Sequence, residues 1–167
     1  MVFFNPIILC NNFRSHLRRY AHVANENLCI HSVTMPQDFE KITSLFTGTF
    51  LVPAVELYQR LRGCKAYIFD WDGVFNDGFK DEKGSSAFSE IDAMGTNLMR
   101  FSHFLQEGTA PHIAVISGEG NRASFSLAER EHFHSVYFSI RHKEEALKHF
   151  CAEHGLKESE VAFVFDD

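Results

Sequence analysis

The sequence predicts an α/β fold, a three-layer sandwich in which helices cover both faces of a parallel sheet. Two observations lead to this prediction. Four short apolar runs have the length and composition of buried strands, and stretches with helical spacing of apolar residues separate them. The four runs are residues 66–69, 113–116, 135–138 and 161–165. Each run is followed by polar residues, which we expect at one edge of the sheet because the carboxyl ends of parallel strands meet there.

Length and composition fit a single globular domain. The chain has 167 residues, 45% of them hydrophobic, which is enough to bury a core. A net charge of -6 argues against nucleic acid as the main partner. Four cysteines without a C-x-x-C pair indicate reduced thiols, and therefore a cytoplasmic protein. No apolar run approaches the ~20 residues that span a bilayer, so no membrane partner is expected.

The first third of the chain is predicted to precede the domain. Residues 1–34 form an N-terminal extension with three arginines and one glutamate, a charge of +2, so the remaining residues carry -8. Such a basic, amphipathic start also fits a targeting peptide, and Met35 is an alternative first residue of the protein. Residues 35–63 have apolar side chains at helical spacing and are predicted to form one or two lead-in helices that end at Gly63.

Residues 64–167 are predicted to be the domain. Behind the first strand, polar turn residues around Gly84 lie between two short alternating runs of segment 79–91, which predicts a small β-hairpin flap. No segment is long enough for a cap domain. Three helices are expected between the strands: one after the flap, one that reaches about Glu131, and one from Lys143 to Gly155. The first of them carries on one face the apolar side chains Leu98, Phe101, Phe104 and Leu105.

The first strand is followed directly by two aspartates, Asp70 and Asp72, and then by Gly73. Two carboxylates this close repel each other unless a cation lies between them or one of them is protonated. A calcium-binding loop would need a glycine at its sixth position and a glutamate at its twelfth, which here are Phe75 and Asp81, so that reading is excluded. The pair therefore indicates a catalytic or metal-binding site of another kind.

The stretch Asp-x-Asp-Gly-Val-x-x-Asp-Gly, residues 70–78, resembles motif I of the haloacid dehalogenase (HAD) phosphohydrolase superfamily. The longer match is similar to the capless branch typified by 3-deoxy-D-manno-octulosonate 8-phosphate (KDO 8-phosphate) phosphatase. The resemblance implies that Asp70 is the nucleophile, which forms an aspartyl-phosphate. It implies that Asp72 is the general acid and then the general base.

The remaining motifs of the superfamily match in order over about residues 64–167. Ser117 and Gly118 match the phosphate-binding motif II, although a Ser-Gly after a strand is also typical of a helix N-cap. Lys143 matches motif III and would bind both phosphate and Asp70. The alternative is a solvated lysine in a charged helix start, but its place just after the third strand favours the functional reading. Asp166 matches motif IV, with Asp167 as its possible second acid. The resemblance implies Mg²⁺ as cofactor, held by Asp70, Asp166 and the backbone carbonyl of Asp72.

The resemblance implies a Mg²⁺-dependent phosphomonoesterase that acts on a small sugar or sugar-acid phosphate. It also implies a homo-oligomer, since members of this branch are tetramers. Several positions depart from the family pattern: Trp71, Ala93, Glu119 and Phe165, and an end at Asp167 that suggests a domain cut short. They leave open a second interpretation, a catalytically impaired domain that serves as a binding or assembly module.

Overall fold

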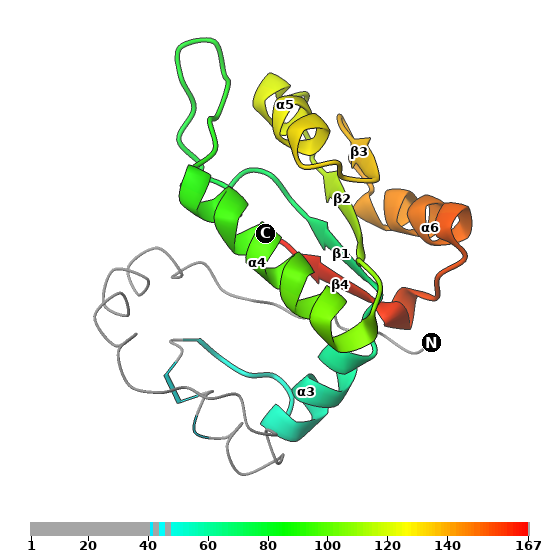
Figure 1. Cartoon of the computed structure of the whole chain (residues 1–167). Coiled ribbons are helices and arrows are strands. Elements are labelled where there is room, and N and C mark those ends of the chain that lie inside the picture. The colour runs from blue at the N-terminus through cyan, green and yellow to red at the C-terminus, as the bar shows by residue number, and fades with distance from the viewer. Residues whose placement is uncertain (1–40, 42–43, 46–47, 167) are drawn as a thin grey trace. The chain divides into compact units, whose positions relative to one another are not determined.

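The computed structural model describes residues 41, 44–45 and 48–166 (Figure 1). The predicted N-terminal extension, the first part of the lead-in and Asp167 lie outside the described residues. The described residues belong to two compact units, one that ends at residue 62 and one that begins at residue 63. In the described part of the first unit, helix α3 spans Ala54–Arg62 and carries an ion pair between Glu56 and Arg60, one turn apart. It follows Pro53 and ends just before Gly63, as the pattern predicts.

The second unit contains the predicted parallel sheet. Its strands are β1 (Ala66–Phe69), β2 (His112–Ile116), β3 (Ser135–Tyr137) and β4 (Val161–Val164). They lie in the order β3-β2-β1-β4, and every neighbouring pair is parallel. The chain therefore builds the sheet outward from β1 on one side and then crosses back to add β4 on the other. This change of direction falls between β1 and β4, the kind of position where open α/β sheets bind their ligands.

Helices cover both faces of the sheet, so the three-layer prediction is confirmed for this unit. The helices are α4 (Glu90–Glu107), α5 (Arg122–Arg130) and α6 (Lys143–His154), with a short 3₁₀ turn at Glu158–Glu160. On one face, Ala146 and Phe150 of α6 pack against Ile68 and Ile116. On the other face, α4 and α5 pack against a second cluster that includes Trp71 and Leu127. No separate cap domain is present in the described unit.

The ends of these helices follow from their flanking residues. Ser89 caps the amino end of α4 and Asn121 that of α5, each accepting a hydrogen bond from a backbone N–H two residues on. Gly108 and Gly155 end α4 and α6 in the left-handed conformation, with φ of 75° and 64°. Because Asn121 caps α5, the reading of Ser117 as a helix N-cap is wrong.

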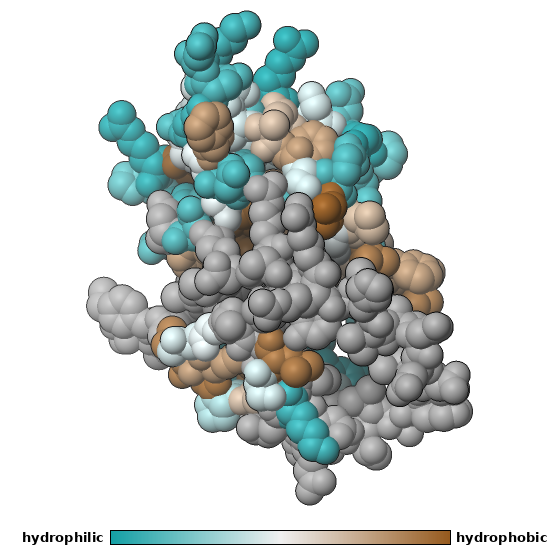
Figure 2. All heavy atoms as spheres, turned by 90° about the vertical axis from the view of Figure 1, so that its left-hand side faces the viewer, coloured by the Kyte–Doolittle hydropathy of each residue, from teal (hydrophilic) through white to brown (hydrophobic). Residues whose placement is uncertain are grey.

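The sequence indicated helix α4 but not its buried face. Its large apolar side chains point outward, with Leu98, Phe101 and Leu105 exposed by 61%, 58% and 67%. The side chains turned inward are smaller, among them Ala93 and Thr96. Apolar spacing identifies a face of a helix, but it does not say whether the sheet or another surface covers it. On the coloured parts of the face that Figure 2 shows, hydrophobic side chains lie among hydrophilic ones.

The flap also differs from the sequence prediction, which was a small β-hairpin. Residues 79–89 contain no strand; they form a loop that projects beyond the amino end of α4 (Figure 1). Its hairpin character is limited to one turn, in which Asp81 N donates to Ser85 O and Gly84 N donates to Asp81 O. The Asp81 carboxylate also accepts from the N–H groups of Lys83 and Ser85. These side-chain bonds replace the cross-strand bonds that a β-hairpin would make.

Two of the cysteines lie in the described residues. Cys64 and Cys151 are both buried. Burial raises the pKa of Cys64 to about 11, so this thiol is inert at neutral pH. In the part of the chain that the structure describes, no helix is long and apolar enough to cross a membrane.

Three histidines meet at the amino ends of the strands, opposite the predicted site. The ring of His112 lies 4.6 Å from that of His134 and 4.5 Å from that of His154, measured between centroids. His112 Nδ1 and His154 Nε2 are buried without a hydrogen-bond partner among the described residues. Burial lowers the pKa of His112 and of His134, and repulsion by the neighbouring rings lowers it further, with Arg100 adding to the effect on His134.

This cluster predicts a loss of stability in mild acid. A base with a lowered pKa in the folded state binds fewer protons there than in the unfolded chain, so stability falls as the pH drops below the ordinary histidine value. We expect the melting temperature to fall by roughly 2–5 °C between about pH 7.5 and about pH 5.5.

The replacement His112→Phe should reduce that pH dependence, because one titrating ring is removed from the cluster. Thermal melts of this variant at the two pH values would be compared with those of His132→Asn. His132 is exposed and adopts a left-handed φ of 55°, which asparagine tolerates. If both variants kept the pH dependence of the parent, the cluster would not be its source.

Candidate active site

The predicted site residues come from four loops at the carboxyl edge of the sheet. Asp70 and Asp72 follow β1, Ser117 follows β2, Lys143 opens α6 after β3, and Asp166 follows β4. The sheet order places β1 between β2 and β4, so the two aspartates have the other loops on both sides.

Asp70 is buried and its two carboxylate oxygens have different partners. Oδ1 accepts a hydrogen bond of 2.6 Å from the backbone N–H of Trp71, and Oδ2 lies 2.5 Å from Lys143 Nζ. The Asp70 side chain is 8% exposed and that of Lys143 24% exposed. The ammonium group therefore offsets the negative charge of a buried carboxylate. Lys143 is thus not a solvated lysine at a helix start.

Asp72 faces the flap. Its Oδ1 is 2.5 Å from the hydroxyl of Ser86, and its Oδ2 is 3.6 Å from Lys80 Nζ. Lys80 also pairs with Glu119, at 2.5 Å, and this hydrogen bond is the main cause of its raised pKa. Glu119, one of the departures from the family pattern, therefore holds a cation of the flap beside Asp72.

Sequence reasoning missed the residues behind Asp72. Ser86 is 1% exposed, and its hydroxyl contacts Trp71 Nε1 at 3.1 Å and Asn121 Nδ2 at 2.7 Å. Trp71, which departs from the family pattern, is fully buried and stacks on Phe75 in the core. Its side chain therefore fixes the loop that follows β1. The sequence offered one signal for the network, the Ser85-Ser86 pair in an otherwise charged flap, but nothing that pointed to Asn121.

Ser117 and Gly118 lie at the end of β2. Ser117 is buried, and its hydroxyl accepts a hydrogen bond of 3.3 Å from the N–H of Glu119. Gly118 is exposed. A Cβ at this glycine would meet only the carbonyl oxygen of Ile140, at 3.9 Å. The position does not need glycine for space.

Asp166 lies against the loop that follows β1. A Cβ at Gly73 would overlap the Asp166 carboxylate, and Gly73 has a φ of 74°, so both space and conformation require glycine there. Phe165, another departure, packs edge-on against Phe163 within the core on the α6 side, where it does not fill the site. Asp167 lies outside the described residues.

The site's potential metal ligands are oxygen atoms. Asp70 and Asp166 supply carboxylates, and these hard donors fit Mg²⁺, which binds through one or two carboxylates and keeps several waters. Among the described residues, no group of three or more His, Cys, Asp or Glu side chains has the arrangement of a metal site. A metal here would therefore depend on water, phosphate and backbone oxygens as well.

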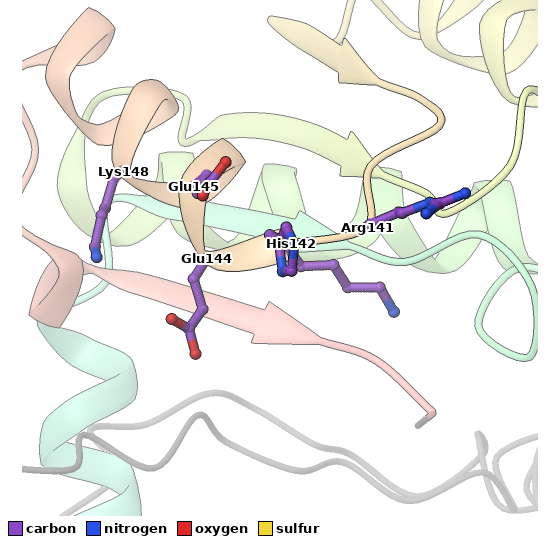
Figure 3. A pocket seen from close by; sticks show the side chains of 6 residues that line it. Arg141, His142, Glu144, Glu145 and Lys148 are labelled. Atoms are coloured by element: carbon purple, nitrogen blue, oxygen red, sulfur yellow. The ribbon is translucent and has the colours of Figure 1, made fainter.

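A depression of about 530 Å³ lies at the amino end of α6. Figure 3 shows Arg141 beyond the carboxyl ends of the strands, with Glu144, Glu145 and Lys148 along the helix. Lys143 also lines it, so the depression adjoins the Asp70 pair. Arg141 adds a second cation near that end, which the sequence reading did not single out.

The comparison with known proteins rests on solved structures, because no family model and no curated protein matches the sequence. A KDO 8-phosphate phosphatase from Moraxella catarrhalis, solved with magnesium, phosphate and KDO, is 23% identical over 67% of this chain and 63% of its own, with a TM-score of 0.57. The cobalt-bound deoxy-D-mannose-octulosonate 8-phosphate phosphatase of Haemophilus influenzae is 23% identical over 65% and 62%, with a TM-score of 0.55.

A Legionella pneumophila protein assigned to the HAD superfamily (subfamily III A) hydrolases is 27% identical over 67% of this chain and 60% of its own, with a TM-score of 0.57. The chain thus spans 60–63% of the length of these solved proteins. The likeness agrees with the parallel sheet and its covering helices. This chain has the fold of the HAD superfamily hydrolases and resembles, among them, the KDO 8-phosphate phosphatases.

Proposed function

We propose that this protein is a Mg²⁺-dependent phosphomonoester hydrolase that works through an aspartyl-phosphate intermediate. The observation that supports it best is the Lys143 ammonium 2.5 Å from the buried Asp70 carboxylate. Asp70 is the nucleophile, and Lys143 orients it and offsets the charge of the incoming phosphate. Asp72, on the same loop, donates a proton to the leaving alcohol and later accepts one from the attacking water.

The other site loops fit phosphate binding. The hydroxyl of Ser117 and the exposed backbone of Gly118 lie at the end of the strand beside β1, where hydrogen-bond donors to phosphate oxygens are needed. Lys143 contributes to the same phosphate subsite. Together with Asp70 these groups would surround a phosphoryl group with donors on one side and the nucleophile on the other.

Magnesium is the proposed cofactor, with Asp70, Asp166 and the backbone carbonyl of Asp72 as its protein ligands. When bound, it neutralises phosphate charge and relieves repulsion between the carboxylates. Asp167 is proposed as a second acid near it. Relatives with this fold were solved with magnesium or cobalt, which supports a divalent ion of this type.

The proposed substrate class is a small sugar or sugar-acid phosphate. The Moraxella relative was solved with phosphate and KDO, a sugar acid. In this chain Lys80 places a cation 3.6 Å from Asp72, the residue that faces the leaving group. A cation on that side fits a leaving group with its own carboxylate, such as a sugar acid.

The test is phosphate release from a panel of sugar and sugar-acid phosphates, with KDO 8-phosphate included, in the presence of Mg²⁺ and after treatment with EDTA. We expect turnover that requires the metal and is fastest with an acidic sugar. Mg²⁺ should also raise the melting temperature of the parent but not of Asp166→Asn, since binding to the folded state stabilises it. The proposal would be contradicted if the protein showed no turnover with any of these substrates and no Mg²⁺-dependent rise in melting temperature.

The alternative of a catalytically impaired binding module is not favoured. The close Lys143–Asp70 pair serves no evident purpose in a module that merely binds. Glu119 and Phe165, which motivated that alternative, have structural partners in Lys80 and Phe163.

We further propose a cytoplasmic homo-oligomer, a tetramer by analogy with the family. The exposed apolar side chains of α4 are the surface that a second copy would cover: Ile91, Met94, Leu98, Phe101 and Leu105 recur at the spacing that packs helix against helix. Analytical ultracentrifugation over a range of concentrations would establish the oligomer. A monomer at every concentration would refute it.

A further inference from the structure

The hydroxyl of Ser86 is surrounded by three polar groups, which together fix the direction of its proton. Three polar groups lie within hydrogen-bond distance of its oxygen: Trp71 Nε1 at 3.1 Å, Asn121 Nδ2 at 2.7 Å and Asp72 Oδ1 at 2.5 Å. A serine hydroxyl has one proton to donate and two lone pairs that accept. The roles of the three neighbours therefore determine where its proton points.

Two of these neighbours are donors. The indole N–H of Trp71 can only donate. The amide of Asn121 has its orientation fixed from the other end, because Oδ1 accepts a hydrogen bond of 2.9 Å from the backbone N–H of Ala123 as the cap of α5. Its NH₂ group therefore faces Ser86, where it donates to the hydroxyl and to the backbone carbonyl of the same residue.

With both lone pairs of Ser86 occupied, its proton has one acceptor left, Oδ1 of Asp72. We propose that Ser86 is a positioning residue that keeps Asp72 Oδ1 permanently as a hydrogen-bond acceptor, so that Asp72 exchanges its catalytic proton through Oδ2 alone. This inference rests on the proposed phosphatase function. In this proposal the flap residue Ser86 orients the Asp72 carboxylate and determines which of its oxygens carries the proton.

The proton transfers of both chemical steps then use the same atom, Oδ2 of Asp72. In the first, an oxygen of Asp70 bonds to phosphorus while the ester P–O bond breaks, and its electron pair goes to the leaving oxygen, which takes the proton from Oδ2. In the second, water attacks phosphorus, the bond to Asp70 breaks with its electrons returning to the carboxylate, and Oδ2 accepts the proton from water. Asp72 ends protonated, as it began.

Lys80 lies on the side of Oδ2, at 3.6 Å, and is held there by Glu119. It therefore faces the oxygen that becomes negative when the proton leaves. Ser86 and Lys80 thus contact the two different oxygens of the Asp72 carboxylate. Both residues belong to the flap, which has no regular secondary structure.

The experiment compares two kinds of substrate in Ser86→Ala. Alkyl phosphates need a proton on their leaving oxygen, whereas p-nitrophenyl phosphate has a leaving group that departs without one. We expect kcat/KM for the alkyl phosphate to fall by about tenfold or more, and that for p-nitrophenyl phosphate to fall far less. The matched control is Ser85→Ala, which removes a neighbouring hydroxyl that contacts Asn121 Oδ1 and not Asp72. It should leave the ratio of the two substrates unchanged.

Asn121→Asp provides a second variant of nearly the same shape. Aspartate still caps α5, but its carboxylate cannot donate to Ser86, so the serine proton can turn toward it and away from Asp72. The same selective loss with alkyl phosphates is expected. An equal loss with both substrates in Ser86→Ala and Asn121→Asp, or no loss in either, would overturn the inference.

A readout that needs no activity separates this inference from the proposed function. The chain has one tryptophan, so its indole N–H gives a single NMR signal. We expect this proton to exchange slowly with solvent in the parent and in Ser85→Ala, and quickly in Ser86→Ala. Fast exchange in the parent would contradict the network itself. A slow indole proton in a protein without turnover would refute the phosphatase proposal, and with it the catalytic role of Ser86, but not the network.

Discussion

Replacing Asp70 by asparagine is expected to abolish phosphate release, with a fall in kcat on the order of 10⁴ or more. The amide has nearly the shape of the carboxylate but is a far weaker nucleophile, so no covalent phosphoryl intermediate forms. Asp70 is buried, with Trp71 N and Lys143 Nζ on its two oxygens, so the substitution removes the carboxylate that these two groups hold in place. The measurement is steady-state phosphate release together with a search for a phosphorylated intermediate in rapidly quenched reactions of the parent.

The matched control is Asp77→Asn, the same change seven residues along the same loop. Asp77 is exposed, and its Oδ1 accepts from the N–H of Phe79, a bond that asparagine can also make. This variant should retain most of the activity. If Asp70→Asn and Asp77→Asn behaved alike, or if the phosphorylated intermediate formed in Asp70→Asn, the assignment of Asp70 as nucleophile would be wrong.

The sheet and the location of the site could be predicted because both depend on short-range pattern. Buried parallel strands such as β1 and β2 are continuous apolar runs, and the residue that follows each run must lie at the carboxyl edge. Asp70 and Lys143 were expected in contact because a known family places them so, and in this structure they are 2.5 Å apart. Their catalytic roles stay predictions until activity is measured.

The features that the sequence did not predict depend on contacts between segments far apart along the chain. Asn121 touches Ser86 across 35 residues, and no periodicity encodes that contact. The inner face of α4 was not recognised because the sheet accepts small side chains such as Ala93 at close approach, while the larger ones point outward. The histidine cluster joins β2, the start of β3 and the end of α6, three places that become neighbours only when the sheet forms.

Lys143→Met should produce the other large loss, a fall in kcat by a factor of about 10² to 10³, the usual effect of removing one electrostatic contact from a reacting group. Methionine keeps much of the apolar stem of lysine but removes the ammonium group that lies against the Asp70 carboxylate and would offset the charge of the incoming phosphate. The same change should lower the free energy of unfolding by roughly 1–3 kcal/mol, because Asp70 loses a partner while it is still largely buried.

The control for this variant is Lys148→Met, a second lysine of α6 that lines the same depression but is exposed. Charge and helix are altered equally, so a general effect of net charge on anionic substrates would appear in both variants. We expect Lys148→Met to change kcat and stability little, because an exposed lysine loses only weak, screened interactions. Equal effects of the two variants would show that Lys143 acts through bulk charge, and the 2.5 Å contact with Asp70 would then have no catalytic consequence.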